Sequence, residues 1–172
     1  MTQLNGEGDH LRLEDVRVRP YGITDAPRLR RMSARLSTAS LFTRFFTGTP
    51  YIPETYVRRL DRLDHWNHEA LAALLDDDIV GIAEYVRDRA DPHRAELAVL
   101  VTDPWQHHGV GRLLVGCLAR MAARRGITAF GADVLLENRA ALSAVHTGWP
   151  LARPSYEDGS ATFRLPLAPT AA

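Results

Sequence analysis

Residues 94–126, RAELAVLVTDPWQHHGVGRLLVGCLARMAARRG, carry the pattern that decides the fold. The segment 94–101 is almost continuously apolar, which is typical of a strand covered on both faces. After the connection T-D-P-W, the turn Q-H-H-G-V-G-R at 106–112 leads into a helix predicted over 109–125 and ended by Gly126. Free backbone N–H groups and the positive end of the helix dipole meet at such a turn, so it predicts a site for a phosphate or pyrophosphate.

The chain on either side of this stretch predicts further strands and helices. Alternating Val16 and Val18 predict a short strand before Pro20, and Thr24 is expected to cap a helix that carries Leu29, Met32 and Leu36. The other predicted elements are helical segments near 41–46 and 56–60, strands over 69–75, 79–87, 127–136 and 160–165, and a short helix over 138–146. This order predicts a mixed α/β sheet domain over 15–165, between flexible ends at 1–14 and 166–172.

Composition excludes several classes of function. The 172 residues are enough for one domain, and 45% hydrophobic with 24% charged residues is an ordinary globular composition. All 21 basic residues are arginine, which excludes Schiff-base chemistry, pyridoxal phosphate attachment and a P-loop lysine. The lone Cys117 excludes an internal disulfide framework and a cysteine-based zinc site.

Charge and hydropathy also predict where the protein works. The 21 acidic residues balance the arginines, so we expect no nucleic-acid partner and no anionic membrane surface. Residues 1–10 have neither the basic start nor the apolar stretch of a signal peptide, and no apolar run reaches the roughly 18 residues of a membrane span. We therefore expect a soluble, cytoplasmic protein.

The glycine turn can be compared with known phosphate-binding turns. A P-loop needs a lysine after its second glycine, and a dinucleotide-binding fingerprint needs a small residue where Leu114 stands. The remaining pattern Q-x-x-G-x-G after a strand resembles the coenzyme A pyrophosphate loop of the GNAT N-acetyltransferases. A helix start that merely turns tightly remains the alternative. In either case a side chain at Gly109 or Gly111 would hold an anion away from the backbone.

Two further segments strengthen this resemblance. D-V-L-L-E-N-R-A-A-L at 133–142, ending near Gly148 and Trp149, is similar to the family's strand and the helix beside the pantetheine arm. With L-F-T-R-F-F at 41–46, the chain resembles most the bacterial protein-lysine acetyltransferases that act on acetyl-CoA synthetase and related acyl-adenylate enzymes. The resemblance covers about 40–149 and implies the GNAT acyl-CoA N-acyltransferase fold, a mixed, mostly antiparallel central sheet flanked by helices.

The resemblance also implies acetyl-CoA as cofactor and the residues that hold it, with no metal. The backbone of the predicted strand would hold the acetyl carbonyl and the pantetheine amides, as an added strand does. The turn would hold the pyrophosphate, and a side chain after the next strand would bond the pantetheine arm. The residues of the strand are Val99, Leu100 and Val101, and the side chain is that of Asn138. The residues of the turn are Gln106, His107, His108, Gly109, Val110, Gly111 and Arg112.

Glu96 is the predicted general base. It lies in an otherwise apolar strand, where an unpaired carboxylate is expected to have a raised pKa. A lysine acceptor arrives protonated, and a carboxylate of raised pKa can remove that proton directly or through one water. The resemblance implies the same role. The alternatives are a surface-facing Glu96, or one paired with Arg94 or Arg87, and Glu84 is the substitute candidate.

The sequence departs from the family pattern in three places. His107 and His108 replace the commoner glycine and basic residue of the loop, which predicts weaker or pH-dependent coenzyme binding. Val145 falls where many members have a tyrosine that protonates the leaving thiolate, so Ser143, His146 or water would serve instead. The last helix is expected to be one residue short before Gly148.

Other side chains have weaker signals. His65, His68 and Glu69 look like part of a metal site, but the order is wrong for a zinc helix and a third ligand is missing, so a partly exposed helix end is expected. The aromatic residues at 42, 45 and 46 are expected in the core. Arg44 among them faces either an acceptor protein or solvent.

These observations predict an acetyl-CoA-dependent N-acetyltransferase in which Glu96 activates the amine of a protein lysine, on an acceptor such as an acyl-adenylate-forming synthetase. One alternative is an enzyme for a small amine, which a narrow acidic pocket would favour over an open, arginine-lined groove. The other is an acyl-CoA-binding sensor without catalysis, to which the His-His loop and the missing tyrosine point.

Overall fold

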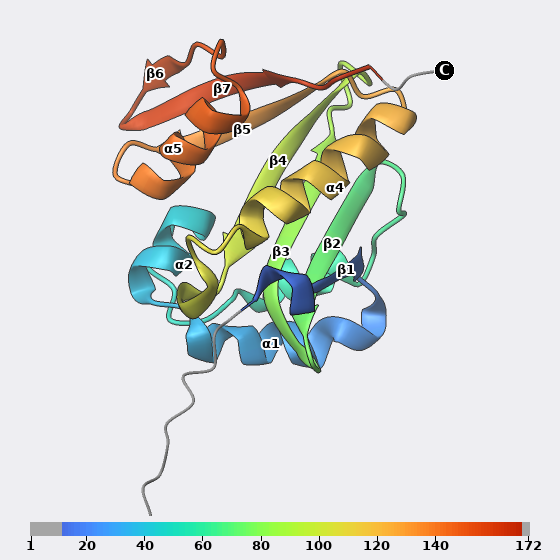
Figure 1. Ribbon diagram of the computed structural model, residues 1–172, viewed down its shortest axis with the longest axis vertical. Helices are drawn as coiled ribbons and strands as arrows, with labels where there is room; N and C mark the ends of the chain where they lie inside the picture. Colours follow the sequence, from blue (N-terminus) through green and yellow to red (C-terminus); the bar gives the residue numbers. More distant parts are fainter. Residues whose placement is uncertain (1–11, 170–172) are drawn as a thin grey trace, which may run out of the picture.

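The computed structural model describes residues 12–169, which form a single seven-stranded sheet with helices on both faces (Figure 1). The spatial order is β1-β2-β3-β4-β5-β7-β6, and every neighbouring pair is antiparallel except β4 and β5. The predicted mixed, mostly antiparallel sheet is confirmed. The strands are β1 (Arg17–Pro20), β2 (His68–Leu75), β3 (Asp78–Arg87), β4 (Arg94–Val101), β5 (Ala129–Leu135), β6 (Ser155–Glu157) and β7 (Ser160–Pro166).

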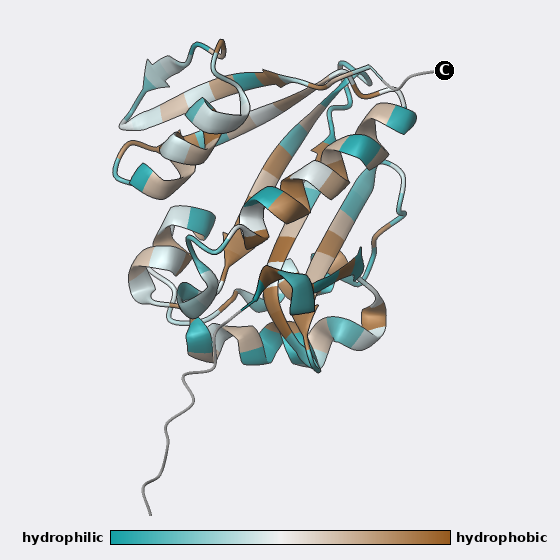
Figure 2. Cartoon of the chain, in the orientation of Figure 1, coloured by the Kyte–Doolittle hydropathy of each residue, from teal (hydrophilic) through white to brown (hydrophobic). Residues whose placement is uncertain are grey.

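Five α-helices cover the sheet. Hydrophobic residues of α4 pack on one face of β2 and β3, and those of α1, α2 and α3 pack on the other face. Alternate residues of a strand point to opposite faces, and nearly all residues of β2 and β3 are buried, so both faces of these strands are covered. Figure 2 shows hydrophobic stretches along them behind α4. The helices are α1 (Ala26–Met32), α2 (Thr38–Phe45), α3 (Glu54–Leu60), α4 (Val110–Arg124) and α5 (Arg139–Gly148).

Helix α4 lies close to the sheet because its buried residues follow a single stripe. Val110, Leu114, Leu118 and Ala122 recur every four residues and are all buried. A methyl group on Gly81 of β3 would come within 2.9 Å of Val110 Cγ1, so only glycine permits this approach. The close packing fixes the start of α4 relative to β3 and β4.

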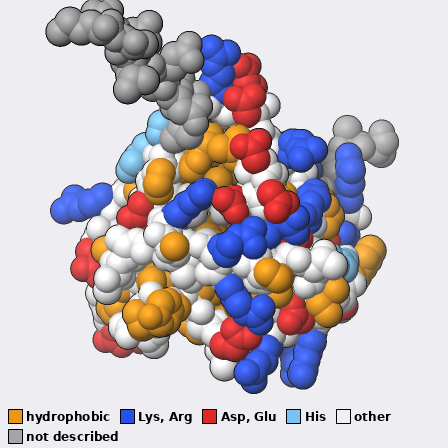
Figure 3. All heavy atoms as spheres, turned by 90° about the horizontal axis from the view of Figure 1, so that it is seen from below, with side chains coloured by type: hydrophobic (Ala, Val, Ile, Leu, Met, Phe, Trp, Pro, Cys, Tyr) orange, Lys and Arg blue, Asp and Glu red, His pale blue; other side chains and the backbone are white. Residues whose placement is uncertain are grey.

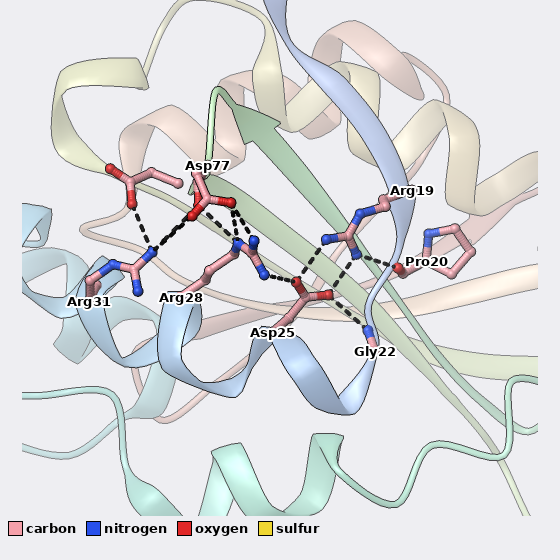
Figure 4. A network of polar contacts seen from close by, with 8 residues as sticks. Arg19, Pro20, Gly22, Asp25, Arg28, Arg31 and Asp77 are labelled. Atoms are coloured by element: carbon pink, nitrogen blue, oxygen red, sulfur yellow. Dashed lines mark hydrogen bonds and ion pairs between the residues drawn. The ribbon is translucent and has the colours of Figure 1, made fainter.

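The start of α1 is held by an ionic network rather than by the expected Thr24 cap. A 3-10 turn at Ile23–Asp25 precedes the helix, and the fully buried Asp25 accepts hydrogen bonds from the Gly22 N–H (2.9 Å) and from the Arg19 guanidinium (2.6 and 2.8 Å). Arg28 bridges Asp25 to Asp77 in the β2–β3 turn (Figure 4). Thr24 was therefore the wrong cap, because Asp25 supplies the acceptor.

The same end of the molecule carries a balanced charge pattern. Figure 3 shows arginine and acidic side chains interspersed on the face seen from below, the end at which Figure 1 draws α1. Arg31 and Arg35 pair with Asp78 there. The Asp-rich turn between β2 and β3 thus docks onto α1 through ion pairs.

Several sequence expectations need correction. Strand β6 was missed because Ser155–Glu157 is short and fully exposed. Leu36 lies beyond α1, since a 3-10 turn at Ser33–Arg35 intervenes. Phe42 and Phe46 are exposed at 39% and 46%, and of the three aromatic residues only Phe45 packs against the core, edge-on to Tyr56.

The ends of the domain are partly described. Residues 1–11 and 170–172 lie outside the described residues, so the flexible ends stay a prediction there. Next to them, Leu13–Asp15 forms a 3-10 turn and Pro166 ends β7. Between residues 12 and 169 there is no helix with the length and apolar character that crossing a bilayer requires.

Candidate active site

Strands β4 and β5 separate at Glu96. They pair in parallel only at three positions, of which Glu96 opposite Gly131 is the last. From Leu97 to Val101, β4 pairs with β3 on one side and with no described strand on the other. Figure 1 shows the two strands diverging, with α2 near the end of β4 and α5 beside β5. On this open side the backbone groups of Val99 and the Val101 N–H can therefore hydrogen-bond to an extended ligand, whereas the Leu100 backbone faces β3 and the Val101 carbonyl accepts from the Gln106 side chain at 3.1 Å.

The turn before α4 presents free amides. No acceptor within residues 12–169 takes a hydrogen bond from the backbone N–H groups of residues 107–112, and Gly109, the N-cap of α4, has no side-chain cap. Gly109 has a left-handed φ of 88°, which favours glycine. These donors and the helix dipole suit a pyrophosphate.

Gly111 lies in the first turn of α4. A methyl group on it would lie 3.7 and 3.9 Å from the side chains of Val101 and Val99, which is ordinary van der Waals contact. The fold alone does not require glycine there. A ligand approaching the backbone does require it, so Gly111 fits the cradle for a coenzyme phosphate.

Gln106 holds the turn in place through its side chain. Its Nε2 donates to the Val101 carbonyl (3.1 Å) and to Ser40 Oγ of α2 (3.0 Å). Asp103 accepts from the same Ser40 hydroxyl at 2.8 Å. The Gln106 backbone N–H donates to the Thr102 carbonyl at 3.1 Å, so Gln106 joins the turn to β4 and α2, and its predicted coenzyme contact stays a prediction.

The other side chains of the turn are directed differently. His107 has a left-handed φ of 64° and is exposed. The His108 ring lies edge-on to Trp105, 5.9 Å between centroids. Arg112 is exposed and makes no ion pair with the described carboxylates. The predicted backbone contacts at Val110 and its neighbours remain predictions, and their N–H groups are free to make them.

Glu96 is exposed, as the alternative of a surface-facing side chain expected, and it makes no hydrogen bond or ion pair with any described residue, Arg94 included. The expected alternative of a pair with Arg87 does not form, because that guanidinium donates to the Pro92 and Arg125 carbonyls. Partial burial, with Asp133 nearby, raises the pKa of Glu96, and the charge of Arg94 only partly opposes this. The raised pKa makes the Glu96 carboxylate a stronger base than an ordinary glutamate.

Gly131 makes room for that carboxylate. A methyl group on Gly131 would come within 2.8 Å of the Glu96 carboxyl carbon. Sequence reasoning missed Gly131 and Asp133 as neighbours of the base. A glycine inside a strand is a signal for close approach, but what approaches it depends on the pairing of β4 with β5.

Glu84, the substitute base, is unsuited to the role. It is 2% exposed and accepts from Arg44 (2.6 Å), Arg59 (2.8 Å) and His68 (2.6 Å). Burial alone would raise the pKa of Glu84, but the bond from His68 and the two arginines outweigh it and the pKa is lowered. Arg44, expected to face an acceptor or solvent, instead binds this buried carboxylate between Phe45 and Tyr56.

Helix α5 differs from its expected form. It runs to Gly148, two residues beyond the predicted end at 146, and the shortening relative to the family pattern stays a prediction. The Asn138 side chain caps it by accepting from the Ala141 N–H at 3.1 Å, and its Nδ2 makes no bond within the described chain. Val145 is buried, whereas Ser143 and His146 are exposed. Because Oδ1 is used by this cap, the predicted hydrogen bond from Asn138 to the pantetheine arm would come from Nδ2.

The histidines at the start of β2 belong to separate contacts. His65 Nδ1 lies 2.8 Å from Glu69 Oε1, and Glu69 also binds Arg125. His68 binds Glu84 instead. The sequence predicts a partly exposed segment here, and His65 is exposed. Within residues 12–169 no three metal-ligating side chains lie together.

Comparison with known proteins decides the family. The model of the acetyltransferase (GNAT) family matches residues 36–148. The chain belongs to the GNAT acetyltransferase family. It is similar to the GNAT domain of S. lividans PAT, with 30% identity, a TM-score of 0.83, and coverage of 88% of this chain and 90% of that domain.

Two more distant GNAT-fold structures agree in architecture. The ribosomal-protein-alanine N-acetyltransferase of Brucella melitensis is 19% identical with a TM-score of 0.68, covering 88% of this chain and 99% of that one. The yncA protein of Salmonella typhimurium, solved with its cofactor acetyl-CoA, is 16% identical with a TM-score of 0.71, covering 92% and 97%. The GNAT fold, the acetyl-CoA cofactor and an acetyl-CoA-dependent N-acetyltransferase activity are thereby established for this chain.

Proposed function

We propose that this GNAT enzyme acetylates a lysine of a protein acceptor, with Glu96 as general base. The observation that carries the proposal is the unpaired Glu96 carboxylate, of raised pKa, at the point where β4 and β5 separate. It lies beside the free backbone edge that suits the coenzyme arm. A lysine ammonium entering there meets a carboxylate able to take its proton.

Each part of the site has a separate task. Acetyl-CoA supplies an acetyl thioester, whose carbonyl carbon an uncharged amine attacks: the C–N bond forms, the C–S bond breaks, and coenzyme A leaves as a thiolate that takes a proton from solvent. The free amides of residues 107–112 hold the pyrophosphate, the backbone of Val99 and Val101 on the open side of β4 holds the pantetheine amides and orients the acetyl carbonyl, and Asn138 Nδ2 donates to the arm. Glu96 removes the proton from the acceptor ammonium, directly or through one water.

The acceptor is proposed to be an acyl-adenylate-forming enzyme such as acetyl-CoA synthetase. The sequence resemblance to bacterial protein-lysine acetyltransferases supports a protein acceptor. The sheet beside Glu96 supports it too, because a shallow, open surface lined by arginines lies there instead of a narrow acidic pocket. A small amine remains the competing substrate class.

Transfer of labelled acetyl groups tests the acceptor. The enzyme is incubated with labelled acetyl-CoA and an acyl-adenylate-forming enzyme, and acetyl-lysine is located by mass spectrometry. Since the chain contains no lysine, all acetyl-lysine in the mixture belongs to the acceptor. Transfer to small amines with none to the protein would overturn the proposed acceptor.

The substitution Glu96→Gln separates an enzyme from a sensor. We expect acetyl-CoA binding, measured by isothermal titration, to stay within about twofold of wild type, and turnover to fall on the order of 100-fold or more, because the base is lost while its shape is kept. Glu157→Gln, an exposed acid in β6, is the control and keeps wild-type turnover. Equal turnover in the Glu96→Gln variant and wild type would refute the role of Glu96.

A further inference from the structure

The sheet face that carries Glu96 is open over β5, β7 and β6. Glu96 pairs with Gly131, and Gly131 pairs with Arg164, so these three positions lie side by side on one face. Thr162 and Asp133 pair on the same face, and both are exposed. The opposite face packs into the core through Ala161, Phe163 and Leu165. No described helix packs against the open face at these positions, because α1 to α3 pack against β2, β3 and β4.

Three arginines line a cavity on this open face. The cavity has a volume of about 360 Å³, and its lining includes Arg94, Arg153 and Arg164 together with Ser155 and Thr162. No acidic side chain of the described residues lines it, and none of the three guanidinium groups makes an ion pair within residues 12–169. Arg94 Nε is buried and has no hydrogen-bond partner among the described residues. Three unneutralised guanidinium groups and one unsatisfied donor point to an anion.

A second arginine-lined cavity shows the contrast. The cavity beside β1 has a volume of about 370 Å³ and is lined by Arg19 and Arg28, but Asp76 and Asp77 line it too. Arg19 is already bonded to Asp25, and Arg28 to Asp25 and Asp77 (Figure 4). The third arginine of this lining, Arg17, makes no ion pair among the described residues, but it shares the cavity with Asp76 and Asp77. The cavity beside Glu96 differs because its arginines have no such partners.

The separation between base and arginines suits one kind of acceptor. Arg94 is two residues before Glu96 on β4, which places their Cα atoms about 7 Å apart on the same face. Arg164 is two strands away from Glu96, about 10 Å at the usual strand spacing. When the ammonium of an acceptor lysine lies at Glu96, a carboxylate of the same acceptor several ångströms away can therefore lie against the arginines.

We propose that the cavity formed by Arg94, Arg153 and Arg164 binds a carboxylate of an aspartate or glutamate that neighbours the acceptor lysine. This inference rests on the proposed protein acceptor and adds its sequence preference. The arginines come from β4, from the segment before β6 and from β7, and the cavity is shallow. That arrangement suits an extended peptide crossing three segments of the sheet, whereas sites for small ligands are enclosed and largely apolar.

Matched peptides test the preference. Each contains a single central lysine, flanked by aspartates in one peptide and by asparagines in the other. We expect wild-type kcat/KM to be on the order of tenfold higher for the aspartate peptide, mainly through KM, and the difference to shrink as salt increases. Arg153→Gln and Arg164→Gln are each expected to reduce the preference about fivefold without changing activity on the asparagine peptide.

A matched control and a binding readout complete the test. Arg17→Gln removes an exposed arginine from β1, at the far edge of the sheet, and should keep the full preference. Fluorescence anisotropy of the labelled aspartate peptide, with coenzyme A present, reports binding to the arginine cavity independently of transfer. We expect weaker binding in Arg164→Gln and unchanged binding in Arg17→Gln.

The outcomes separate this inference from the proposed function. Equal use of both peptides by wild type, or a preference that survives in the Arg153→Gln/Arg164→Gln double variant, overturns the arginine cavity while the protein acceptor stands. Acetylation of free glutamate, lost in the double variant, with neither peptide bound or acetylated, overturns the protein acceptor and assigns the anion site to a small amine. Acetyl transfer to neither peptide, together with arginine-dependent binding of the aspartate peptide, supports the cavity and counts against the proposed transfer.

Discussion

Two carboxylates on the same face of the sheet have opposite properties because of their neighbours. Glu84 is buried and bound by three cationic or hydrogen-bonding side chains, so its pKa is lowered and it stays ionised. Ala98 pairs with Glu84, and Glu96 lies two residues before Ala98 on β4. Glu96 lies beyond the edge of the layer formed by α1 to α3 and has no partner among the described residues. Only Glu96 combines access with a raised pKa, which is what a general base requires.

Asp133 is expected to tune the base. Its negative charge raises the pKa of Glu96, so Asp133→Asn should lower that pKa and shift the acidic limb of the kcat/KM profile to lower pH. Asparagine can still accept the Thr162 hydroxyl bond that Asp133 accepts at 2.6 Å. The measurement is kcat/KM against pH at constant ionic strength.

Asp158→Asn is the control for this shift. It removes a carboxylate from the β6–β7 turn that does not contribute to the pKa of Glu96. Asparagine also tolerates the left-handed backbone there, φ 45°. An acidic limb that stays in place in Asp133→Asn would mean that Glu96 is not the titrating base.

At the scale of elements, the site depends on where α4 begins. The helix is pressed against β3 at Gly81, and Gln106 ties the preceding turn to β4 and α2. The free amides of the turn are therefore held in place beside the open edge of β4 before any ligand binds. Preorganised donors of this kind bind an anion without a further ordering cost.

Gly111→Ala tests this cradle. The added methyl group fits the folded protein, so the thermal midpoint should stay the same or rise slightly. It would hold a pyrophosphate away from the backbone, so the Kd for acetyl-CoA should rise about tenfold or more, which is about 1.4 kcal/mol. Isothermal titration and a thermal scan measure the two effects.

Gly116→Ala is the matched control in the same helix. A methyl group there meets only the Arg120 side chain, at 3.7 Å, and lies away from the turn. It should gain the same small helix stability and keep wild-type affinity for acetyl-CoA. If Gly111→Ala also keeps that affinity, the first turn of α4 does not hold the coenzyme.

At the scale of the whole molecule, a buried ionic cluster joins two layers. Glu84 of β3 links Arg44 of α2, Arg59 of α3 and His68 of β2. The layer that includes α2 and α3 is thereby fixed on the sheet. Removing Glu84 leaves the Arg44 guanidinium, whose side chain is 14% exposed, buried without its counter-charge, whereas the Arg59 side chain, at 52%, is solvated.

Glu84→Gln is therefore expected to lower the free energy of unfolding by about 3–5 kcal/mol. The folded-state pKa of Glu84 lies below its ordinary value of 4.5, so its stabilisation is present above pH 4.5 and is lost as the pH falls through the lowered value. Urea unfolding of wild type and variant between pH 7 and acidic pH measures both effects.

Glu54→Gln serves as the control for this stability loss. Glu54 pairs with Arg30 on the surface at 2.6 Å, where water screens the charges. Its stability should remain close to that of wild type across the same pH range. A Glu84→Gln variant as stable as Glu54→Gln would show that the cluster does not hold α2 and α3 to the sheet.

The sequence by itself determined the parts of the site that are local in the chain. An apolar strand, two glycines and an amphipathic helix over 94–126 are consecutive, so their order predicts the glycine turn at the start of α4 and the exceptional Glu96 within β4. The family resemblance and the mostly antiparallel sheet followed from these residues and a few flanking motifs, and both are confirmed.

Only the tertiary structure decided which distant residues meet. Glu84 and Glu96 look equivalent in sequence, but α2 and α3 neutralise the first and leave the second free. Asp133 and Arg164 reach the base through the pairing of β4, β5 and β7. The burial, the bonding partners and the nearby charges of each carboxylate come from segments far apart in the chain. The order of residues in the sequence does not give the distances between those segments.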